Sequence, residues 1–173
     1  MAEKVGIFIC GCRGAISGVV NLGKVGEGMA KVKKNVGAKV IHDFLCGPEG
    51  RETIINSVRE NGIDCLLVAA CPEDVHEDTF KQIAKDAGLR DGMLLRLDLR
   101  EGCALAHKGN PVAATVKAIN LIRMYNGRAK LMEPYAPPVV PGVKDVLIVG
   151  GGLAGLMTTI KIAEAGIPVD LFS

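Results

Sequence analysis

The stretch Cys65-Leu66-Leu67-Val68-Ala69-Ala70 is a short, continuous apolar run with no polar residue to face solvent. Such a run is typical of a strand covered on both faces, as in a parallel sheet. Three similar runs alternate with four helical patterns. The runs span 4–10, 39–45 and 93–97, and the helical patterns span 19–34, 49–61, 77–87 and 111–130. This alternation predicts an α/β fold, with an open parallel sheet of about four strands and helices on both faces.

Glycines and prolines punctuate this pattern. Gly37, Gly62 and Gly88 follow the first three helical patterns, where the left-handed residue of a helix C-terminus belongs. Pro48 and Pro72 each come shortly after an apolar run, at a turn that leads into a helix.

A second pattern begins after a proline-rich segment. Residues 131–143 contain four of the eight prolines, which predicts a linker. After it come an apolar run at 146–149, a glycine-rich turn, a helix through Ala165 and a second apolar run at 169–172. This order predicts a partial Rossmann βαβ unit. The expected organisation is an α/β domain at 1–130, a linker at 131–143 and the Rossmann start at 144–173.

Composition excludes several classes of partner. The formal net charge is +2, only 3% of residues are aromatic, and tryptophan is absent, so we expect no nucleic-acid partner.

No apolar run reaches about 18 residues and the N-terminus does not look like a signal peptide, so we expect a cytoplasmic protein without a membrane segment. Six cysteines in a reducing compartment indicate metal binding, redox chemistry or inert core thiols.

Four of these cysteines follow the four predicted strands in turn: Cys12, Cys46, Cys71 and Cys103. Because the carboxyl ends of parallel strands meet at one edge of a sheet, the four thiols are expected to converge there. Four thiolates suit a [4Fe–4S] cluster or a structural zinc. Isolated cysteines lack the paired spacing of common zinc sites, but the pattern alone does not separate the two metals.

The remaining cysteines leave alternatives open. Cys10 competes with Cys12 for one ligand position, and Cys12 is favoured because it lies in the loop. The two could also act as a redox-active thiol pair, which would require a thiol of low pKa. Cys65 begins its strand at the opposite edge of the sheet and is expected to be core.

Histidines give a weaker signal. His107 follows Cys103 by four residues and could hydrogen-bond a cluster sulfur or relay a proton. His42 and His76 are expected to be packing or capping residues.

Four cysteine-containing stretches resemble the N-terminal domain found in A subunits of heterodisulfide reductases. They are 9–14 (Ile-Cys-Gly-Cys-Arg-Gly), 44–50 (Phe-Leu-Cys-Gly-Pro-Glu-Gly), 68–80 and 99–108. The resemblance implies an iron–sulfur flavoprotein in which the matching cysteines ligate a cluster. It also implies a dimeric assembly, with ferredoxin, hydrogenase, formate dehydrogenase or disulfide-reducing subunits as partners.

The turn Gly150-Gly151-Gly152-Leu153-Ala154-Gly155 fits the Gly-x-Gly-x-x-Gly dinucleotide motif, with Gly150, Gly152 and Gly155 as cofactor-binding residues. The last 30 or so residues resemble the FAD-binding start of these flavoproteins, or of succinate dehydrogenase and fumarate reductase flavoproteins. So short a unit cannot enclose FAD, so we expect flavin only in the full-length protein.

Two functional hypotheses follow. The first is an electron-transfer iron–sulfur domain that relays electrons between a flavin and partner redox subunits, without catalysis by the isolated chain. The second is a non-redox module, with zinc or no metal, that docks or dimerises subunits of a larger complex.

Overall fold

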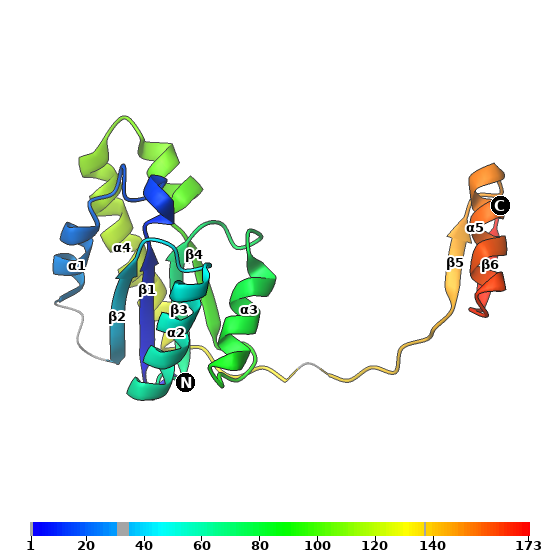
Figure 1. Ribbon diagram of the computed structural model, residues 1–173, viewed down its shortest axis with the longest axis horizontal. Helices are drawn as coiled ribbons and strands as arrows, with labels where there is room; N and C mark the ends of the chain where they lie inside the picture. Colours follow the sequence, from blue (N-terminus) through cyan, green and yellow to red (C-terminus); the bar gives the residue numbers. More distant parts are fainter. Residues whose placement is uncertain (1, 31–34, 137) are drawn as a thin grey trace. The chain divides into compact units, whose positions relative to one another are not determined.

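The computed structural model describes residues 2–30, 35–136 and 138–173 (Figure 1). The chain divides into two compact units, Met1–Ala136 and Pro137–Ser173. The division falls inside the proline-rich segment, where residues 133–136 and 138–145 form neither helix nor strand. Each unit is described by itself below.

The first unit is built on a four-stranded parallel sheet. Its strands are β1 (Val5–Cys10), β2 (Val36–His42), β3 (Cys65–Ala70) and β4 (Leu94–Asp98). Their order across the sheet is β2-β1-β3-β4, and every neighbouring pair runs parallel. The predicted α/β fold with an open parallel sheet is therefore confirmed.

Helices cover both faces of this sheet, as predicted (Figure 1). They are α1 (Leu22–Ala30), α2 (Pro48–Asn61), α3 (Glu77–Asp86) and α4 (Pro111–Ala129). Alternate residues of β1 face opposite ways: Ile7 and Ile9 pack in the core under α1 and α4, whereas Phe8 and Cys10 pack in the core under α2 and α3. The central strands β1 and β3 thus separate two apolar cores, which explains why the sequences of these two strands lack polar residues.

Local signals set several helix ends. The Asn21 side chain accepts a hydrogen bond from the Lys24 amide at 3.0 Å, which begins α1. The Asn110 side chain accepts from the Ala113 amide at 3.1 Å and begins α4. At the other end of α2, Gly62 adopts φ +58°, the left-handed conformation expected of it.

Two predicted elements begin three residues away from their observed starts. The second strand is Val36–His42 rather than 39–45, so Gly37 lies within the strand and does not cap a helix. Phe44 and Leu45 belong instead to a turn closed by a hydrogen bond from the Gly47 amide to the Phe44 carbonyl. The first helix begins at Leu22 rather than 19, because residues 16–20 form hydrogen-bonded turns before it; its predicted end at 31–34 lies outside the described residues.

The second unit contains β5 (Val146–Val149), α5 (Leu153–Glu164) and β6 (Val169–Phe172). β5 and β6 pair in parallel, which confirms the predicted βαβ arrangement. Across the described parts of both units, no helix is both long enough and apolar enough to cross a membrane.

Candidate functional site at the carboxyl ends of the sheet

The strand order creates a switch point between β1 and β3. From β1 the chain moves outward to β2, then crosses back to β3 on the other side of β1. The loops that follow β1 and β3 therefore leave in opposite directions, which is where open α/β sheets bind ligands. Cys10 is the last residue of β1, and Cys71 directly follows β3.

Cys10 is buried at this point and its sulfur accepts two backbone hydrogen bonds. The donors are the amides of Cys12, at 3.3 Å, and Leu45, at 3.5 Å. A hydrogen bond from the Cys12 side chain lowers the pKa of Cys10 to about 6, against the opposing effect of burial and with the help of the two amides. The same hydrogen bond raises the pKa of Cys12. One hydrogen bond between the two side chains thus shifts their pKa values in opposite directions.

The loop after β1 is held in a rare backbone conformation. Cys12 and Arg13 both have positive φ, 50° and 49°, although neither is glycine. Such conformations cost of order 1–3 kcal/mol each and cluster at functional sites. Hydrogen bonds from the Gly11 amide to the His42 carbonyl and from the Arg13 amide to the Asp43 carbonyl hold the loop against the end of β2. These hydrogen bonds therefore fix the direction in which the Cys12 side chain leaves the backbone.

Cys46 joins this group from the loop between β2 and α2. It packs, half-buried, against the same core as Cys10 and Cys71. Burial raises the pKa of the Cys46 thiol, and the nearby charges of Cys10 and Cys71 raise it further. The charge of Cys71 also raises the pKa of Cys12. The structure therefore places Cys10, Cys12, Cys46 and Cys71 at one apolar core, near enough for their charges to affect one another.

Cys71 has a cationic neighbour that the sequence reasoning missed. Arg96, in the middle of β4, donates from Nη2 to the Cys71 sulfur at 3.4 Å and to the Cys71 carbonyl at 3.2 Å. Arg100 is also close enough for its charge to act on Cys71 and Cys12. An arginine inside the apolar run Leu94-Leu95-Arg96-Leu97 was the available signal, because a charge on a doubly covered strand needs a reason to be there.

Cys103 is placed differently from the other predicted ligands. It lies in a π-helical turn, Arg100–Ala104, which begins beside β3 with a hydrogen bond from the Leu99 amide to the Ala70 carbonyl. Its sulfur donates to the Ala114 carbonyl at 3.3 Å and packs in the core under α1 and α4. Burial raises the pKa of the Cys103 thiol. Within the described residues, no three His, Cys, Asp or Glu side chains are arranged to hold a metal ion.

The other sequence candidates take structural positions. Cys65 is fully buried at the start of β3 with its sulfur 3.9 Å from that of Met132, and burial raises its pKa to about 12. His107 Nδ1 lies 3.1 Å from the carbonyl oxygen of Cys103. His42 accepts the Phe44 amide at 3.0 Å, and His76 stands at the N-cap of α3.

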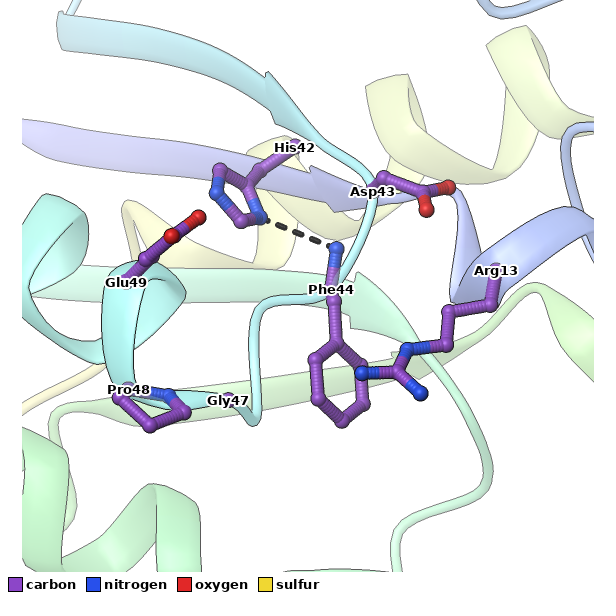
Figure 2. Close-up of a pocket in the computed structure, with 7 residues that line it drawn as sticks. All are labelled: Arg13, His42, Asp43, Phe44, Gly47, Pro48 and Glu49. Atoms are coloured by element: carbon purple, nitrogen blue, oxygen red, sulfur yellow. Dashed lines mark hydrogen bonds between the residues drawn. The ribbon is translucent and has the colours of Figure 1, made fainter.

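A hollow of about 470 Å³ lies beside the cysteine-bearing loops (Figure 2). Its lining residues come from the loop after β1 and the segment from β2 into α2: Arg13, His42, Asp43, Phe44, Gly47, Pro48 and Glu49. The Arg13 guanidinium stacks on the Phe44 ring at 3.9 Å from its centroid. The segments that carry Cys12 and Cys46 therefore border an open hollow rather than a sealed core.

The glycine motif of the second unit has the geometry of a dinucleotide turn. Gly150 has φ +115°, which side chains rarely adopt. A Cβ on Gly155 would collide with the Gly150 carbonyl, so glycine is needed where α5 approaches β5. Gly152 is the N-cap of α5, and a Cβ there would meet open space, which leaves room for an anion at the helix N-terminus.

One family model and several known proteins match this sequence. The sequence model of the family described as FAD binding domain matches residues 145–173. The A subunit of the ferredoxin/F(420)H(2)-dependent CoB-CoM heterodisulfide reductase of Methanosarcina acetivorans is 35% identical over 97% of this chain and 21% of that protein. The iron-sulfur A subunit of the CoB–CoM heterodisulfide reductase of Methanocaldococcus jannaschii is 34% identical over 99% of this chain and 26% of that protein.

A third relative, the A subunit of the H(2):CoB-CoM heterodisulfide,ferredoxin reductase of Methanothermobacter marburgensis, is 34% identical over 94% of this chain and 25% of that protein. The resemblance to the A subunits of heterodisulfide reductases is thus confirmed along nearly the whole chain, which spans between a fifth and about a quarter of these relatives. A mutant enoyl thioester reductase of Candida tropicalis overlaps 100% of this chain and 55% of that one, at 12% identity and a TM-score of 0.28, too low to bear on the fold.

Proposed function

We propose that residues 1–130 form an iron–sulfur domain that relays electrons between a flavin and partner redox subunits. The proposed ligands of one [4Fe–4S] cluster are Cys12, Cys46, Cys71 and Cys103, with Cys10 as the alternative to Cys12. One observation carries the proposal: cysteines from three separate loops gather at the switch point of the sheet, beside a buried arginine. A bound cluster would supply one-electron uptake and release.

The side chains present suit such a group in ligand type. Soft thiolates suit iron–sulfur clusters, and the hydrogen bond from the Cys12 side chain lowers the pKa of Cys10. Amide hydrogen bonds to sulfur, such as that from Leu45, stabilise the anionic form. Two nitrogens of the buried Arg96 side chain have no hydrogen-bond partner among the described residues, which suits an anionic neighbour.

Among the proposed ligands, Cys103 alone packs only in the core under α1 and α4. To serve there, Cys103 has to release the Ala114 carbonyl and turn its sulfur out of the core under α4. Short π-helical turns such as this one are frequent at functional sites. Cys10 packs at the same core as Cys12, Cys46 and Cys71, so a set with Cys10 in place of Cys103 is a second arrangement, and replacing each cysteine separately distinguishes the two ligand sets.

The flavin and the partners belong to the full-length protein. The FAD-binding match and the open N-terminus of α5 support FAD binding by Gly150, Gly152 and Gly155 once the rest of that domain is present. The relatives are named for ferredoxin, H(2) or F(420)H(2). We extend that class of redox partner to this chain, together with assembly as a homodimer and a cytoplasmic location.

Anaerobic reconstitution of the 173-residue chain tests the proposal. With ferrous iron and sulfide, the chain should gain about four irons and four sulfides and a broad visible absorbance band. Serine at each proposed ligand should lower the iron content, whereas Cys65→Ala, in the core, serves as the matched control. A colourless chain that takes up zinc, or no metal, would support the non-redox docking module instead. A yellow chain with bound FAD would refute the full-length requirement for flavin.

A further inference from the structure

The side chain of Arg96 is buried in the core of the first unit. It is 5% exposed and lies in β4, paired with Val68 of β3 and flanked by Leu95 and Leu97. It faces α3, where its guanidinium carbon stands 4.1 Å from the centroid of the Phe80 ring. A charged residue is rarely this buried in a parallel strand unless it is paired.

The contacts of Arg96 converge on the turn that follows β3. Its Nη2 atom lies 3.2 Å from each of three carbonyl oxygens, those of Cys71, Pro72 and Val75. The same atom lies 3.4 Å from the Cys71 sulfur. One guanidinium nitrogen therefore fixes both the backbone of the turn and the sulfur of a proposed ligand.

The charge of Arg96 is only partly compensated by these contacts. Carbonyl dipoles and the face of the Phe80 ring offer partial negative charge. The carboxylate whose pKa responds to Arg96 is Glu77, at the exposed start of α3, and Lys81 is its main partner. Nε and Nη1 of Arg96 have no hydrogen-bond partner among the described residues. A guanidinium stays charged when buried, so the turn that carries Cys71 lies beside a fixed positive charge.

We propose that Arg96 is the positioning residue of the sulfur site, holding the turn after β3 so that Cys71 faces its fellow ligands and supplying fixed positive charge to the centre. This inference rests on the proposed iron–sulfur function and deepens it. A fixed positive charge would favour the more negative, reduced state of a bound cluster, so Arg96 would raise its reduction potential. The three carbonyl contacts act separately, by fixing the direction of the Cys71 side chain.

Two substitutions separate these roles. Arg96→Met removes the charge and the hydrogen bonds but keeps an apolar side chain of similar length, a change that buried ionic sites often tolerate. Arg96→Lys keeps the charge but replaces the planar fork with a single ammonium group. Arg59→Gln is the matched control, because it removes one positive charge at an exposed site on α2.

The experiment compares the reconstituted 173-residue chains anaerobically. Iron retention against a competing chelator should fall about 10–100-fold in Arg96→Met, as for other partners of metal ligands. The reduction potential, read by electron paramagnetic resonance during a redox titration, should become more negative. Arg96→Lys should retain less iron than the parent chain but keep a potential closer to it. Arg59→Gln should match the parent chain in both.

The outcomes distinguish the role of Arg96 from the proposed iron–sulfur function on which it rests. If the parent chain takes up no iron and sulfide, the iron–sulfur function itself fails. If the parent chain holds iron and folded Arg96→Met retains it equally well at the same potential, Arg96 is only structural and the inference is overturned. If circular dichroism shows that Arg96→Met does not fold, Arg96→Lys decides: reduced retention supports the inference, and unchanged retention overturns it.

Discussion

Replacing Cys12 with alanine should raise the pKa of Cys10 from about 6 toward the ordinary value of a thiol. The hydrogen bond from the Cys12 side chain is the largest cause of the lowered pKa, and burial of Cys10 opposes it. The amides of Leu45 and Cys12 still donate to the sulfur in the variant, because both are backbone groups. Part of the lowering should therefore remain.

The size of the shift can be worked from the lost hydrogen bond. A hydrogen bond to a charged group contributes about 1.5–3 kcal/mol. One pKa unit corresponds to about 1.4 kcal/mol. Cys12→Ala should thus raise the pKa of Cys10 by about 1–2 units, whereas Cys12→Ser, which keeps a hydroxyl donor, should raise it less.

A difference titration measures this shift. The metal-free, reduced 173-residue chain is titrated under argon while the ultraviolet absorbance of the thiolate is followed, and the curve of the Cys10→Ala variant is subtracted. The parent chain should show a midpoint near 6 that Cys12→Ala moves upward. A midpoint that stays near 6 without the Cys12 thiol would refute the hydrogen-bond explanation, and a parent midpoint near 9 would refute the thiolate itself.

Three other substitutions test separate parts of the structure. The free energy of unfolding, measured in urea, should rise between about pH 6 and 9, because the lowered pKa of Cys10 stabilises the folded chain fully above pH 9 and this stabilisation is lost as the pH falls through 6. Cys10→Ala should flatten this rise. Asn110→Ala should cost about 1 kcal/mol in urea unfolding, because the cap of α4 is lost; no change would argue against the cap. Gly155→Ala should speed hydrogen exchange in α5 but not in β3, because its Cβ would overlap the Gly150 carbonyl; unchanged protection of α5 would contradict the turn geometry.

The sequence was sufficient for those elements whose signals are local. The run from Cys65 to Ala70 is apolar because both faces of β3 are covered, so its limits could be found from residue type alone. The second strand was misplaced because apolar residues also occur in buried turns. Leu45 is fully buried, but it belongs to a turn that packs into the core, and residue type does not distinguish a buried turn from a buried strand.

The grouping of the cysteine sulfurs could not be predicted from local sequence alone. Strand ends predicted the shared edge of the sheet, but the order β2-β1-β3-β4 decides which sulfurs approach one another. Cys12 and Cys71 follow the two central strands, on either side of the switch point. The role of Cys10 also depends on tertiary contact, because one of its amide donors, Leu45, is 35 residues away in sequence.

Cys103 follows β4 as predicted, but its side chain packs in the core under α1 and α4, away from the other proposed ligands. The turn after β4 starts next to β3, but its π-helical winding directs the sulfur toward Ala114, under α4. If Cys103 ligates the cluster, binding must break that contact, and Cys103→Ser should lose iron while Cys10→Ser retains it. If Cys10 is the fourth ligand, the order reverses and the turn keeps its place. Iron content of the two variants, reconstituted side by side, therefore reveals whether metal binding draws Cys103 out of its core.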